Sequence, residues 1–193
     1  MARETSLDRD RILDAATEVL RRFGPEKTNV VDVARSLDVT HGSLYRYFPD
    51  KRSLLDATVE RWLHRLCAGL PAIVEGKEPA ADRLEQWLLG LIDLKQQFAL
   101  QDRELFAAYN QIADQAREVI ARHVADLLGQ IVTIIETGIV EGSFRDQDAG
   151  AAARAVFRAT AFFHHPYHVL GQPDVPDRDE VLTLVRLVIQ GLR

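Results

Sequence analysis

The chain lacks the features of disulfide-rich, membrane-spanning and secreted proteins. It has a single cysteine, Cys67, which excludes an internal disulfide framework. It has no uninterrupted apolar run of about 18 residues, the length that crosses a bilayer. Its first ten residues carry too many charges for a secretory signal. We therefore expect a cytoplasmic protein with no membrane partner.

The sequence also lacks motifs of catalysis and cofactor binding. There is no Gly-x-Ser-x-Gly elbow, no Gly-rich phosphate loop and no His-Glu-x-x-His pair. The acidic pair Asp146 and Asp148 lies at a predicted helix start, where capping and the helix dipole explain it. We expect no enzymatic activity and no cofactor. The alternative is that the chain is a small helical enzyme with an apolar substrate pocket.

The chain has no excess of positive charge. It contains 24 Lys and Arg against 29 Asp and Glu, a net charge of −5, which argues mildly against nucleic-acid binding. Residues 1–50 contain 8 basic and 9 acidic residues, whereas residues 51–193 contain 16 and 20. A nucleic-acid interface must therefore depend on the local placement of cations such as Arg46, Lys51 and Arg52.

What the chain does have is helical periodicity along most of its length. Apolar residues recur at three- and four-residue spacing, and no alternating strand pattern stands out. A hydrophobic fraction of 47% over 193 residues allows one or two packed domains. Beside two short helices within 28–52, this periodicity predicts helices at 5–23, 50–70, 80–100, 102–112, 114–141, 146–165 and 178–192. Thr5 and Asp8 form a capping pair for the first of these.

Residues 28–52 predict two short helices joined by a tight turn. Asn29 is placed to cap the first helix, which has one apolar face. Asp38 falls at the turn, where Asp tolerates the left-handed conformation. Thr40 can cap the second helix, which buries Leu44 and Phe48 and presents polar, aromatic and basic residues on its other side. A helix of this kind suits the major groove of DNA, as in a helix-turn-helix.

These residues resemble the amino-terminal DNA-binding domain of the TetR family of transcriptional regulators. The resemblance rests on 12–16, Phe23-Gly24, 28–34 and 41–51, so it covers the amino-terminal third of the chain. Members of the family commonly have Gly at the position of Asp38 and Lys at the position of His41. Because of the second difference, the DNA sequence that relatives recognise transfers less well to this chain. The resemblance implies an all-α homodimer with a three-helix DNA-binding domain, 1–50, and a helical effector-binding and dimerisation domain, 51–193. It further implies an effector-released repressor on a palindromic operator.

The predicted contacts with double-stranded DNA divide by chemistry. Hydroxyls and one ammonium can meet phosphates, and these belong to Thr28, Thr40, Tyr45, Tyr47 and Lys51. Other residues can approach base edges, and these are His41, Gly42, Ser43 and Arg46, with Asn29 included in the DNA-binding set. Arg46 is equally suited to a phosphate, and Gly42 allows close approach. The alternative is a solvated face of a small helical domain.

The last two predicted helices are candidates for the homodimer interface. The helix at 146–165 is rich in alanine, and small side chains permit close helix approach. The helix at 178–192 is apolar around much of its circumference and needs burial on more than one face. It is either a deeply buried core helix or part of a two-fold dimer seam. The resemblance favours the dimer.

Aromatic residues in the second domain suggest a site for a small apolar or aromatic effector. Loosely amphipathic helices with several aromatics can enclose an apolar cavity, although core packing explains many such residues. Tyr and His would orient a ligand through hydrogen bonds. The candidate lining residues are Trp87, Phe106, Tyr109, Phe163 and His164.

A metal- or redox-responsive regulator is the remaining alternative. His164 and His168 have the i, i+4 spacing of paired ligands, but Pro166 between them should end or kink the helix. We expect no metal site. Cys67 lies on an apolar helix as a small buried hydrophobe is expected to, and it has no resolving cysteine for redox sensing.

Overall fold

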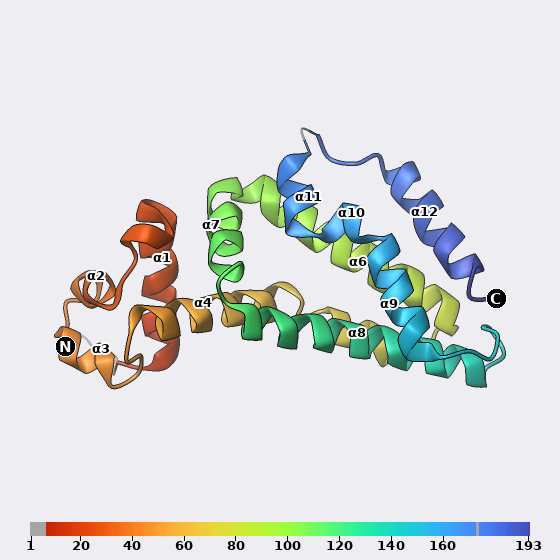
Figure 1. Cartoon of the computed structure of the whole chain (residues 1–193), viewed down its shortest axis with the longest axis horizontal. Helices are drawn as coiled ribbons and strands as arrows, with labels where there is room; N and C mark the ends of the chain where they lie inside the picture. Colours follow the sequence, from red (N-terminus) through yellow and green to blue (C-terminus); the bar gives the residue numbers. More distant parts are fainter. Residues whose placement is uncertain (1–6, 173) are drawn as a thin grey trace, which may run out of the picture. The chain divides into compact units, whose positions relative to one another are not determined.

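The computed structural model describes residues 7–172 and 174–193, and this part of the chain contains helices and no strands (Figure 1). The all-α prediction is confirmed. In chain order the helices are α1 (Arg9–Lys27), α2 (Val30–Ser36), α3 (His41–Tyr45), α4 (Lys51–Leu66), α5 (Leu70–Val74), α6 (Ala80–Gln101), α7 (Arg103–Ala113), α8 (Arg117–Val140), α9 (Ala149–Ala159), α10 (Ala161–His164), α11 (Pro166–Gly171) and α12 (Arg178–Gln190).

The helices form two compact units. The first contains the chain up to Leu63 together with Glu104–Ile120, and the second contains His64–Arg103 together with Ala121–Arg193. This division differs from the sequence-based boundary at residue 50, because most of α4 and all of α7 after its first residue pack with α1 to α3. α4 and α8 each begin in the first unit and continue into the second.

The first unit is built on α1. Asp8 caps this helix, since its side chain accepts a hydrogen bond from the Arg11 amide at 2.8 Å. The predicted cap Thr5 lies outside the described residues. Gly24 has φ 73, a left-handed conformation that interrupts the helical geometry before Pro25. The core joins α1 to α2, α3 and α4 through apolar residues that include Ile12, Ala16, Val33, Leu44, Phe48 and Leu54.

The second unit is organised around α6. The large apolar residues Leu84, Trp87, Leu88 and Leu91 of this helix are completely buried. The Trp87 indole nitrogen donates to Gln130 Oε1 at 2.9 Å, so the ring keeps a hydrogen bond when it leaves water. Apolar residues of α8, α9, α10 and α12 complete the core, among them Ile131, Ile134, Val156, Phe163, Val181 and Val185.

The long helix α8 is apolar enough to meet a length-and-composition test for a membrane span. One such helix is weak evidence, because a core helix of a helical domain has the same composition. Ile131, Ile134 and Ile135 of α8 are completely buried within the second unit. The apolar window of α8 is 28% buried within the protein, so core packing accounts for part of its apolar character.

Candidate nucleic-acid interface and effector domain

The structure confirms the turn between α2 and α3. Asn29 Oδ1 accepts from the amides of Val31 and Asp32 at 2.9 and 3.0 Å, which caps α2. Asp38 has φ 54, and it is the only non-glycine residue with positive φ in the described part of the chain. The sequence therefore uses Asp where a left-handed residue is needed to reverse the chain.

The helix α3 presents polar and aromatic side chains to solvent. Leu44 and Phe48 anchor it in the core. Thr40 precedes the helix without capping it through its side chain; its hydroxyl lies 2.9 Å from that of Ser43. The rings of His41 and Tyr45 meet edge to face with centroids 6.2 Å apart. The exposed residues of this segment are Thr40, His41, Gly42, Tyr45 and Arg46, with Ser43 half-buried.

Three residues predicted to contact phosphates have hydrogen-bond partners within the protein. Thr28 is completely buried, and its hydroxyl donates to the Gly24 carbonyl at 2.8 Å, so its side chain is enclosed in the fold. The Tyr47 hydroxyl donates to the Leu7 carbonyl at 2.7 Å. Lys51 Nζ donates to the Glu26 carbonyl at 2.8 Å. Spacing along the chain does not reveal these bonds, because their carbonyls come from distant or irregular segments.

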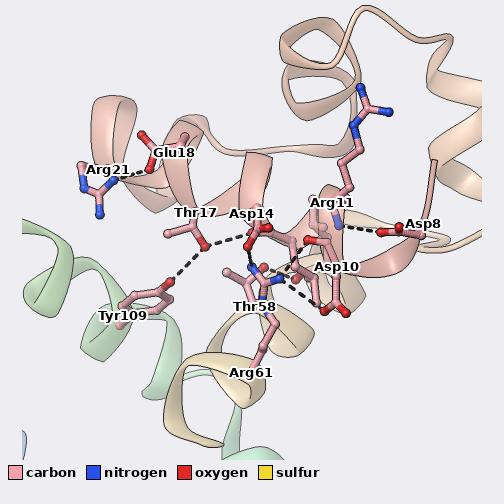
Figure 2. Close-up of polar contacts among 12 residues, drawn as sticks. Asp8, Asp10, Arg11, Asp14, Thr17, Glu18, Arg21, Thr58, Arg61 and Tyr109 are labelled. Carbon is pink, nitrogen blue, oxygen red and sulfur yellow. Dashed lines mark hydrogen bonds and ion pairs between the residues drawn. The ribbon is translucent and has the colours of Figure 1, made fainter. Parts of the chain in front are cut away.

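The rest of the first unit holds α4 against α1. Figure 2 shows Arg61 of α4 between two carboxylates of α1. Its guanidinium donates to the Asp10 carbonyl at 2.9 Å and lies 2.9 Å from Asp14 Oδ1. In the same view the Tyr109 hydroxyl of α7 meets Thr17 Oγ1, 3.2 Å away. The Tyr109 ring stacks on Trp62 of α4 with centroids 4.4 Å apart.

The five predicted effector residues do not belong to one unit. Trp87, Phe163 and His164 are buried in the second unit, where Trp87 is a core residue. Phe106 and Tyr109 are buried in the first, each with its ring against Trp62. An aromatic residue in an amphipathic helix is compatible with either place, so helical periodicity alone did not separate the two groups.

Sequence reasoning missed a buried basic group in α6. Lys95 is 4% exposed, and burial lowers the pKa of its ammonium. Lys95 lies on the same helix face as Leu91, Ile92 and Ala99. The sequence alone shows this lysine among three apolar positions, which indicates a buried basic group.

The metal and redox alternatives gain no support from the geometry. Among residues 7–172 and 174–193, no three His, Cys, Asp or Glu side chains lie close enough to hold a metal ion. His164 instead contacts Thr160 Oγ1 and the Phe157 carbonyl, each at 3.2 Å from its Nε2. Burial raises the pKa of the Cys67 thiol, which disfavours the reactive thiolate.

Comparison with known proteins identifies both parts of the chain. Residues 12–58 match the family model described as bacterial regulatory proteins, tetR family. Residues 80–183 match the model of the tetracyclin repressor-like carboxy-terminal domain. The chain belongs to the TetR family. It is a DNA-binding transcriptional regulator, as the resemblance implied.

Similar proteins include two curated regulators and one solved structure. YhgD of Bacillus subtilis, an uncharacterized HTH-type transcriptional regulator, is 27% identical over 74% of this chain and 75% of its own. The HTH-type transcriptional repressor KstR2 of Rhodococcus jostii is 25% identical over 80% and 76%. The structure of FadR from Bacillus subtilis in complex with stearoyl-CoA superposes with a TM-score of 0.68 and 19% identity, covering 96% of this chain and 97% of FadR.

Proposed function

We propose that this protein is a homodimeric repressor that binds a palindromic operator and is released by a small effector. The observation that carries the proposal is the exposed surface of α3, because its residues are free of the core while Leu44 and Phe48 hold the helix in place. KstR2, a relative over most of the chain, is named a transcriptional repressor. Such a regulator works in the cytoplasm.

Base reading in this proposal belongs to the exposed residues of α3. His41 and Arg46 supply donors for base edges, and the absence of a side chain at Gly42 allows the backbone to approach. Tyr45, with a side chain that projects into solvent, meets a phosphate. Lys51 also contacts a phosphate in this proposal, because an ammonium that donates one hydrogen bond to a carbonyl has further protons to donate.

Dimerisation in this proposal uses α9 and α12. α12 buries Val181, Val185 and Ile189 in its own chain, yet Leu187 is 67% exposed. Ala151, Ala155 and Ala159 of α9 also face solvent. An apolar surface of this kind is suited to an isologous contact with a second copy.

An effector in the second unit would release DNA by shifting a conformational equilibrium. FadR is described in complex with stearoyl-CoA, a ligand with a long apolar chain, and this favours an apolar effector here. Release requires that the effector bind the DNA-incompetent conformation more tightly than the competent one. α4 is the element to carry the change, because it runs without interruption from one unit into the other.

Selection of DNA from a random pool tests this proposal. The purified protein should enrich a palindrome, and fluorescence anisotropy should show tight binding to it. Tyr45→Ala should weaken that binding strongly and remain folded, because Tyr45 is 44% exposed. Enrichment of no sequence, or wild-type affinity in Tyr45→Ala, would contradict the assignment of α3 as the reading helix.

A further inference from the structure

A lysine of α6 projects into the apolar interior of the second unit. Lys95 follows Leu91 by four residues and Ile92 by three, and both of these neighbours on the helix face are buried. The removal of an ammonium from water is costly, so lysine is almost never fully buried without a reason. α6 contacts α10, α11 and α12, which places Lys95 in the part of the protein assigned to the effector.

Two histidines lie within the electrostatic influence of Lys95. Burial, and secondarily the charge of Lys95, lower the pKa of His123 to about 4. Burial is also the main cause that lowers the pKa of His164 to about 4, with a contribution from Lys95. Gln96 donates to the Phe163 carbonyl at 2.9 Å and thereby holds α10 beside α6. We call Lys95, His123 and His164 the basic cluster.

One member of the basic cluster has an unsatisfied hydrogen-bonding atom. The Nε2 atom of His123 is buried and has no hydrogen-bond partner among the residues that the structure describes. A buried polar atom in this state costs free energy until a partner reaches it. The charges that act on His123 and His164 come from Lys95 and His165, both basic, so a partner with negative charge is favoured.

We propose that the basic cluster binds the carboxylate of an effector whose remaining body is apolar. The inference rests on the proposed function, in which the second unit binds an effector, and it specifies the chemistry of that effector. Both imidazoles are neutral at pH 7, so Lys95 is the member of the cluster that can carry a positive charge. A single positive charge balances a carboxylate and not a phosphate dianion, and a bound carboxylate favours the protonated form of Lys95. Leu91, Ile92 and Phe163 supply the apolar surroundings.

Three ten-carbon probes with different head groups test this proposal. Calorimetry with the full chain should show that decanoate binds at least ten-fold more tightly than 1-decanol or decyl phosphate, which corresponds to about 1.4 kcal/mol. Lys95→Met should abolish this preference. Because methionine fills the same volume without a buried charge, the variant should stay folded. His123→Phe provides a second test, since it removes the imidazole donor and should reduce decanoate affinity several-fold.

The matched control is Lys77→Met, since Lys77 is an exposed lysine of the same unit. This variant should keep the wild-type preference for decanoate. Equal affinity of the wild type for decanoate and decanol, tighter binding of decyl phosphate, or a preserved preference in Lys95→Met would each overturn the proposal. So would the absence of decanoate binding by the wild type.

Operator binding is measured in a separate experiment, so the results distinguish failure of the repressor proposal from failure of the carboxylate-site proposal. A protein that binds its selected DNA but does not discriminate decanoate from decanol would refute the carboxylate site alone. A protein that prefers decanoate through Lys95 but binds no DNA sequence would refute the repressor assignment and leave the site intact.

Discussion

Gly42 offers a direct test of DNA recognition at the scale of a single residue. A Cβ atom at this position would meet nothing closer than Thr40 Oγ1 at 4.0 Å, so the free protein has room for alanine. Gly42→Ala should raise the free energy of unfolding by up to about 1 kcal/mol, because alanine favours helix. The affinity for the selected operator should fall at least ten-fold, because the added methyl group occupies space needed by the DNA.

The control for this substitution is Gly129→Ala. Gly129 lies on α8, and a Cβ atom there also meets nothing within 4 Å. This variant should gain comparable stability in urea unfolding and keep wild-type operator affinity. Undiminished operator binding by Gly42→Ala would place the DNA away from this end of α3.

His164 makes stability depend on pH. Burial lowers the pKa of His164 to about 4 in the folded protein, whereas an unfolded histidine has a pKa near 6.5. The unfolded chain therefore binds more protons below about pH 6.5, and stability falls as the pH drops toward 4. We expect His164 alone to cost about 2 kcal/mol of folding stability between pH 7 and pH 5.

Urea unfolding at these two pH values measures the effect. His164→Asn removes this titrating group and should reduce the loss of stability between pH 7 and pH 5 by about 2 kcal/mol. His123, whose pKa is also lowered to about 4, keeps its own contribution. His64→Asn, which changes an exposed histidine of α4, should leave the dependence as in the wild type. If the His164 variant and the wild type lose stability equally, protonation of this imidazole does not limit folding.

At the scale of an element, α12 distinguishes core packing from dimerisation. Val185 is completely buried in its own chain, whereas Leu187 is 67% exposed. Leu187→Glu should therefore leave the fold intact and shift sedimentation at micromolar concentration from dimer to monomer, because it places a charge in an apolar contact. Leu100→Glu changes a leucine of α6 with the same exposure of 67% and should remain dimeric. A dimeric Leu187→Glu variant would exclude α12 from the contact.

Helical periodicity predicted the long elements well and the interrupted ones poorly. The predicted helix 80–100 is α6 (Ala80–Gln101), and the predicted 114–141 is α8 (Arg117–Val140). The predicted 146–165 is instead α9 followed by the separate short helix α10, and Pro166 then begins α11. Each alanine or phenylalanine in this region is compatible with helix. The break at Thr160, between α9 and α10, has no signal in the local pattern, whereas the break before Pro166 follows from the proline itself.

The geometry of the helix-turn-helix could be predicted from the sequence more fully than the packing of the second unit, for the same physical reason. The cap by Asn29 and the left-handed Asp38 depend on neighbouring residues, and both are confirmed. The basic cluster unites side chains of α6, α8 and α10. Its existence depends on tertiary packing, and only the lysine on the apolar face of α6 was visible as a local anomaly.

At the scale of the whole molecule, a dimer doubles each electrostatic contact with the operator. The slope of log affinity against log salt changes by about one for each side chain that neutralises a phosphate. Lys51→Ala should therefore reduce the magnitude of the slope by about two for the dimer and weaken binding to all sequences. Lys77→Ala, in the second unit, should leave the slope unchanged. A wild-type slope in Lys51→Ala would mean that Lys51 serves only its bond to the Glu26 carbonyl.

The inclusion of α7 in the first unit limits how this protein can be recombined. The Tyr109 hydroxyl contacts Thr17 of α1, and its ring stacks on Trp62 of α4, although α5 and α6 separate Trp62 from Tyr109 in the sequence. In a chimaera that takes only residues 1–63 from this chain, Thr17 and Trp62 would face the residue that the other protein has in place of Tyr109. Exchange of DNA specificity between relatives should therefore succeed when Glu104–Ile120 is transferred together with the amino-terminal helices. The DNA-binding unit is thus encoded by two separate segments of the gene.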